Sequence, residues 1–168
     1  MSEDYVVSAF YKAYSKPSLV SNLIGLFTFS NVSHVENISL IDGKSYSSTM
    51  QKGDGGCRGK AIEYKHPERW IFVKMRVNSP QSIYSWEVGQ TTKNKGYDVL
   101  GCLSLAWIRY RNDPDKWFCS EFCRRAYTVD GTLPKLRKTR PLNPSQLKKE
   151  LIKNGGIIVE FDPDWINP

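Results

Sequence analysis

The sequence predicts an α+β fold in which a largely antiparallel sheet packs against helices. Strand-like alternation of apolar and polar residues dominates the first half of the chain, and the tight-turn dipeptide Asp42-Gly43 separates two such stretches, as in an antiparallel hairpin. After Pro80 the apolar residues change to helical spacing. With 168 residues, 40% of them hydrophobic, the chain suits a single domain over residues 1–168.

Four stretches carry the strand pattern, and they follow one another from the N-terminus. "YVVSAFY" at 5–11 comes first, and the hairpin strands 34–41 and 44–50 flank the tight turn. "RWIFVKMRV" at 69–77 alternates in the same way, whereas the glycine-dense segment 52–60 is predicted as a loop. Short connections between these strands favour an antiparallel sheet.

Helical periodicity or capping residues mark five further segments. Asp113 before Pro114 is a typical N-cap and first-turn pair, so we expect a helix to begin at Asp113 or Asp115 and to run to about Tyr127. Gly155 is a typical helix stop. The predicted helices cover 16–27, 81–90, 97–110, 113–127 and 143–154, and a final strand follows at 157–161.

Composition limits the function classes. The net charge of +7 favours anionic partners, but no nucleic-acid-binding motif accompanies it, so binding of nucleic acid or of a host protein stays open without support. The chain opens without a signal-peptide pattern, and its longest apolar run, 19–27, is too short to cross a bilayer. We therefore expect a cytoplasmic protein with no transmembrane segment. The spacing of Cys119 and Cys123 is poor for zinc, and we expect no metal or cofactor.

Cys119 is the best candidate for a nucleophile. A predicted helix start lies just before it, and helix N-termini favour thiolate and present backbone N–H groups to an oxyanion. Cys102 falls in an apolar helix, Cys123 lies one turn further along, and Cys57 lies in a glycine-rich loop that would hold a nucleophile poorly. The alternative for Cys119 is a packing role.

The chain has two histidines as candidates for the base. His34 lies on a predicted strand, where alternation places it on the same face as Glu36 and opposite Val35. His66 precedes Pro67 in a polar connection, where an exposed loop histidine is expected. His34 is therefore the better base, although a lone strand histidine is more often structural.

Five segments in order resemble one known family. They are "SHVE" before the hairpin, "YSS" after it, "GDGGCRGK", "YDVLG" and "WFCSEF". Together they are similar to the circularly permuted NlpC-type papain-like cysteine hydrolases, the YiiX-like group and its bacteriophage-encoded relatives. The resemblance covers roughly residues 17–155. It implies a papain-like fold in which the histidine strand precedes the cysteine helix.

The resemblance also implies roles for individual residues. Cys119 matches the nucleophile and His34 the general base, with the Cys119 amide in the oxyanion hole. The family's third, histidine-orienting residue lies on the strand after the hairpin, where this chain offers Tyr46 and Ser47. A hydroxyl fixes a tautomer but stabilises imidazolium less than a carboxylate does.

Three further residues have weaker indications. Glu36 would supply the missing carboxylate if it reached the imidazole, but a solvated strand carboxylate is the more common case. Arg58 is a candidate for binding an acidic group of the substrate. Trp117, next to the nucleophile segment, is a further candidate for substrate contact, with packing at the helix start as the simpler alternative.

The expected function is covalent acyl chemistry by a Cys-His pair, first of all cleavage of a peptide or amide bond. An acyltransferase and a lipid, ester or thioester deacylase use the same fold and remain alternatives. A rival of another class is an inactive, phage-encoded binding protein with a basic surface. The positive charge favours an anionic substrate in either case.

Overall fold

A computed structural model describes residues 4–13, 31–50, 55–93, 95–104, 113, 115–138 and 140–167. In these residues six antiparallel strands form one sheet in the order β4-β3-β2-β1-β5-β8. Its strands are β1 (Tyr5–Lys12), β2 (Val32–Ile38), β3 (Ser45–Thr49), β4 (Gly56–Lys60), β5 (Trp70–Arg76) and β8 (Ile157–Val159). The helices are α2 (Pro80–Thr92), α3 (Val99–Ser104), α4 (Cys119–Val129) and α5 (Pro144–Lys153). A two-residue parallel ladder joins β6 (Gly96–Tyr97) to β7 (Lys116–Trp117).

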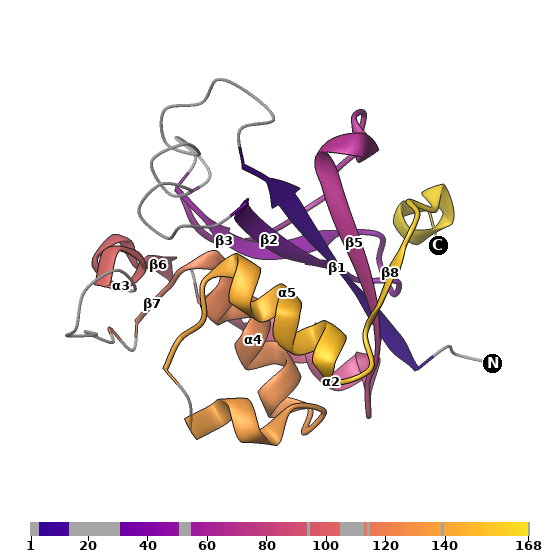
Figure 1. Cartoon of the computed structure of the whole chain (residues 1–168). Coiled ribbons are helices and arrows are strands. Elements are labelled where there is room, and N and C mark those ends of the chain that lie inside the picture. Colours follow the sequence, from indigo (N-terminus) through magenta and orange to yellow (C-terminus); the bar gives the residue numbers. More distant parts are fainter. Residues whose placement is uncertain are drawn as a thin grey trace.

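The sheet separates two apolar clusters. Side chains of β1 alternate between them, because successive residues of a strand point to opposite faces: Val6 and Phe10 join the larger cluster, and Val7 and Ala9 the smaller one. Helices α2, α4 and α5 pack on the face of the larger cluster, as Figure 1 shows. The smaller cluster is completed by the connection after β4 and by the C-terminal segment around Trp165.

Most predicted elements are confirmed within the described residues. The hairpin closes at Gly43, whose φ of 66° suits glycine. Helix α5 begins with a capping box in which Asn143 and Gln146 bond to each other's backbone N–H. The helix predicted at 16–27 lies outside the described residues, as does the part of 97–110 beyond Ser104.

Two predictions of secondary structure are wrong. The segment 52–60 is not wholly a loop, since Gly56–Lys60 form β4 and pair with β3. The helix expected from Asp113 begins instead at Cys119, because Lys116 and Trp117 extend to pair with β6. Among the described residues, no helix has both the length and the apolar character needed to span a membrane.

Candidate active site

Cys119 is the first residue of α4. Two hydrogen bonds fix the chain just before it, because the carbonyl of Trp117 accepts one from the hydroxyl of Ser48 at 2.7 Å and one from the N–H of Asp98 at 3.0 Å. The N-cap, Phe118, provides no side-chain hydrogen bond to the first turn. The thiol therefore lies at the N-terminal end of the helix, where the helix dipole favours negative charge.

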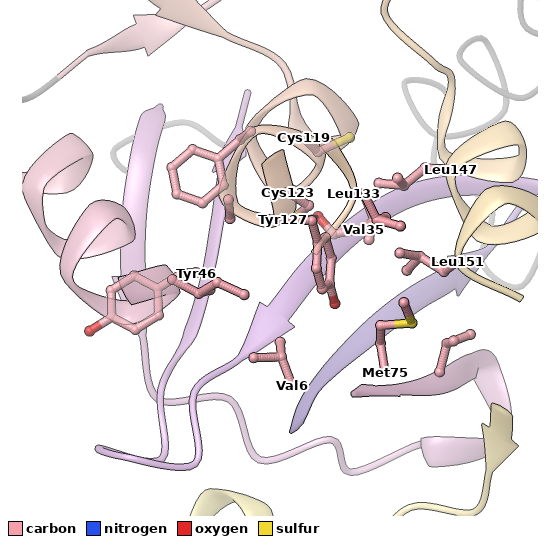
Figure 2. Packing of buried hydrophobic residues seen from close by; sticks show 14 of the residues in the cluster. Val6, Val35, Tyr46, Met75, Cys119, Cys123, Tyr127, Leu133, Leu147 and Leu151 are labelled. Carbon is pink, nitrogen blue, oxygen red and sulfur yellow. Dashed lines mark hydrogen bonds between the residues drawn. The ribbon is translucent and has the colours of Figure 1, made fainter. Parts of the chain in front are cut away.

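Strands β2 and β3 separate beside this helix end. Their ladder pairs Asn37 with Tyr46 and Ile38 with Ser45. Closer to His34, the carbonyl of Val35 accepts the Ser47 hydroxyl at 2.7 Å and the Cys123 thiol at 3.8 Å. These two side chains thus donate to a carbonyl that would otherwise accept from a backbone N–H of the neighbouring strand. Figure 2 shows Cys119 and Cys123 on the same helix next to Val35.

His34 contacts both Cys119 and Glu36. Its Nε2 lies 3.7 Å from Oε2 of Glu36, and the side chain of Cys119 is a second hydrogen-bond partner of the same histidine. Burial on its own lowers the pKa of His34, but the hydrogen bonds and charges of Cys119 and Glu36 outweigh it and raise the pKa from 6.5 to about 9. A protonated His34 is therefore favoured at neutral pH, as a thiolate-imidazolium pair requires.

Glu36 is fully buried, so the expectation of a solvated strand carboxylate is wrong. Its Oε1 accepts a 2.7 Å hydrogen bond from the hydroxyl of Tyr64, and its Oε2 lies 3.6 Å from Nη2 of Arg58 and 3.7 Å from His34. A buried carboxylate is costly without polar or charged neighbours such as these. The same-face spacing of His34 and Glu36 in the sequence was the signal for this contact.

The two residues predicted to orient the histidine form other hydrogen bonds. Tyr46 donates from its hydroxyl to Oδ2 of Asp42 at 2.7 Å and packs in the larger core cluster. Ser47 donates to the carbonyl of Val35. Among the described residues, Glu36 is the acid in contact with the imidazole of His34, and it lies on the same strand as the histidine rather than on the next one.

The two predicted substrate-binding residues lie close to the site but are engaged in the fold. Arg58 is 11% exposed and faces Glu36. Trp117 is partly buried and packs edge-to-face on Trp86, with ring centroids 5.9 Å apart. Nζ of Lys95 lies 5.7 Å from the centroid of the Trp117 ring. Trp117 stands two residues before Cys119 in the chain, and a role of either residue toward a substrate stays a prediction.

The other three cysteines are poorly suited to act as thiolates. Burial raises the pKa of Cys57 to about 11 and that of Cys102 to about 12. Burial also raises the pKa of Cys123 well above its ordinary value. All three are therefore protonated at neutral pH. His66 lies on the surface, 56% exposed, next to Glu68, as expected.

A cavity of about 650 Å³ lies away from these residues. It opens beside the start of β1, the end of β2 and the start of α2, and its described lining includes Tyr5, Ile38 and Glu87 but none of the residues around Cys119. The cavity therefore does not serve the Cys-His pair. No cluster of three or more histidine, cysteine or acidic side chains suited to a metal ion occurs in the described parts of the chain.

Comparisons with known proteins add no assignment. No protein-family model matches the chain, and no curated protein sequence matches it significantly.

Proposed function

We propose that the protein is a cysteine hydrolase of the circularly permuted NlpC-type papain-like kind, in which Cys119, His34 and Glu36 act together. The observation that supports this proposal best is the fully buried Glu36 carboxylate, 3.7 Å from a histidine whose other contact is a thiol at a helix N-terminus. A charge is costly to bury without a partner, and a buried acid beside a histidine that contacts a thiol is an arrangement that favours an activated thiolate.

The chemistry follows from the positions of these three groups. Proton transfer from Cys119 to His34 gives a thiolate and an imidazolium, and Glu36 stabilises the imidazolium. The thiolate attacks a carbonyl carbon, and the oxyanion meets the backbone N–H groups of the first turn of α4. His34 then protonates the leaving group, and water, activated by the neutral imidazole, hydrolyses the thioester between the acyl group and Cys119.

A peptide or amide bond is the substrate that we propose first. The same residues support acyl transfer to another acceptor, or cleavage of an ester or thioester, because all of these reactions pass through an acyl-cysteine. The net charge of +7 favours a substrate with anionic groups.

The test is to trap the acyl-enzyme. The protein is incubated with activated esters, thioesters and peptide amides, and intact mass and peptide mapping locate any acyl group. We expect one acyl group on Cys119, lost in Cys119→Ala and in His34→Ala but retained in the matched control Cys57→Ala. Absence of any acyl-Cys119 across the panel, or equal acylation of several cysteines, would contradict the proposed function and favour a binding protein on the same scaffold.

A further inference from the structure

Tyr64 lies in the connection after β4 and has an unusual backbone conformation. Its φ of 38° is in the left-handed region, the only positive φ of a non-glycine residue among the described residues. Such a conformation is unfavourable for a residue with a side chain and persists where surrounding contacts impose it. Strained residues of this kind cluster at functional sites, so the contacts of Tyr64 are informative.

Aromatic side chains hold the ring of Tyr64 in place. Tyr64 is 4% exposed, and its ring packs against Trp70, Phe72 and Phe161 with centroid distances of 5.1, 5.4 and 5.4 Å. Two of these partners belong to β5, and Phe161 belongs to the C-terminal segment. The hydroxyl of Tyr64 therefore has a fixed position on the face of the sheet that carries the smaller apolar cluster.

The hydroxyl of Tyr64 stands between two other side chains. It donates to Oε1 of Glu36 at 2.7 Å, and it lies 2.7 Å from the hydroxyl of Ser45. Because the Tyr64 proton is used toward Glu36, Ser45 is the donor in the second bond. Burial raises the pKa of Tyr64 well above its ordinary value, so this hydroxyl keeps its proton at neutral pH.

We propose that Tyr64 is a positioning residue of the Cys119-His34 pair: its hydroxyl, held by Ser45 and by surrounding aromatic rings, fixes the Glu36 carboxylate against His34. This inference rests on the proposed function. A fully buried carboxylate must be stabilised by protein groups, and a directed O–H donor both lowers the cost of its burial and selects one rotamer of the acid.

The groups around Glu36 come from several elements. His34 lies on the same strand, Arg58 on β4, and Tyr64 in the connection after it. The buried thiol of Cys123 on α4 is also close enough for the charge of Glu36 to raise its pKa. Arg58 and His34 both lie near Oε2 of Glu36, whereas the hydroxyl of Tyr64 donates a hydrogen bond to Oε1. Removal of the Tyr64 hydroxyl therefore leaves the contact between Arg58 and Glu36 in place.

The experiment is the pH profile of Cys119 alkylation by iodoacetamide in wild type and Tyr64→Phe, which keeps the ring and removes the hydroxyl. Tyr127→Phe is the matched control, because Tyr127 is fully buried and its hydroxyl lies 2.8 Å from that of Ser8, which donates to Asn37 on the opposite face of β2 from Glu36. We expect the midpoint of the Cys119 alkylation profile to rise by about one pH unit in Tyr64→Phe, which is a tenfold loss of thiolate at a pH below the midpoint. In Tyr127→Phe the midpoint should stay at the wild-type value.

The alternatives give different results. A low wild-type midpoint that Tyr64→Phe leaves unchanged would overturn the role of Tyr64 and leave the proposed function intact. A wild-type midpoint at the ordinary thiol value would overturn both. If Tyr64→Phe does not fold, Ser45→Ala removes the donor to Tyr64, and we expect a smaller shift in the same direction; no shift in that folded variant would equally overturn the inference.

Discussion

Replacement of Glu36 by glutamine tests the electrostatic role of this residue with little change of volume. Glu36→Gln removes a negative charge 3.7 Å from Nε2 of His34 and keeps a side chain of the same shape. The imidazolium then loses its anionic neighbour, while the neutral imidazole loses little. We therefore expect the pKa of His34 to fall.

The size of the fall follows from the geometry. An opposite charge within about 4–6 Å shifts a pKa by about 1–3 units. Arg58 lies 3.6 Å from the same oxygen of Glu36 and offsets part of the effect of the carboxylate. We expect a decrease of about 1–2 units from the wild-type value near 9, which corresponds to roughly 1.4–2.7 kcal/mol of interaction with the imidazolium.

The assay is an NMR titration of the histidine ring protons, in which His34 and His66 give the chain's two sets of imidazole signals. Glu68→Gln is the matched control, because Oε1 of Glu68 lies 3.2 Å from Nδ1 of His66 on the surface. That variant should leave the titration of His34 unchanged. If His34 titrates at the same pH in wild type and Glu36→Gln, the carboxylate does not stabilise the imidazolium and its proposed role is refuted.

Four other perturbations have defined outcomes. Because the pKa of His34 is raised from 6.5 to about 9 on folding, its contribution to stability should be complete below about pH 6.5 and be lost as the pH rises through about 9, which denaturant unfolding across this range measures. Leu151→Ala should lower the free energy of unfolding by about 2–4 kcal/mol, since Leu151 is fully buried. Asn143→Ala should cost about 1 kcal/mol in the same assay through loss of the α5 capping box. Gly56→Ala should cost about 1–3 kcal/mol, because φ is 106° there and a Cβ would collide with the carbonyl of Lys95; an unchanged thermal midpoint would contradict this.

The sheet was largely predictable from the sequence, because the patterns that indicate its strands and its turn are local. Alternation along β1 and β5 and the turn at Gly43 are readable within a few residues. The start of α4 was not predictable, because the capping signal at Asp113 is overridden by the pairing of Lys116 and Trp117 with a strand some twenty residues earlier in the chain. A contact between distant segments leaves no local pattern.

The candidate site was likewise predictable only in the features that depend on local sequence. The spacing of His34 and Glu36 predicts that they share a face, and it is a property of one strand. Whether Glu36 is solvated or buried depends on Tyr64 and Arg58, which arrive from other parts of the chain. Tyr64 itself lies in a connection with no distinctive sequence signal, and its backbone conformation and aromatic neighbours appear only in three dimensions.

The measurement that tests the Cys-His pair most directly is the alkylation rate of each cysteine across about pH 5 to 9, resolved by peptide mapping, in wild type and His34→Ala. We expect rapid modification of Cys119 near pH 6 that is lost in the variant, while Cys57, Cys102 and Cys123 react slowly in both proteins because their thiols are protonated. Reaction of Cys119 with a midpoint near the ordinary thiol pKa of about 8.5, unchanged by His34→Ala, would contradict an activated thiolate.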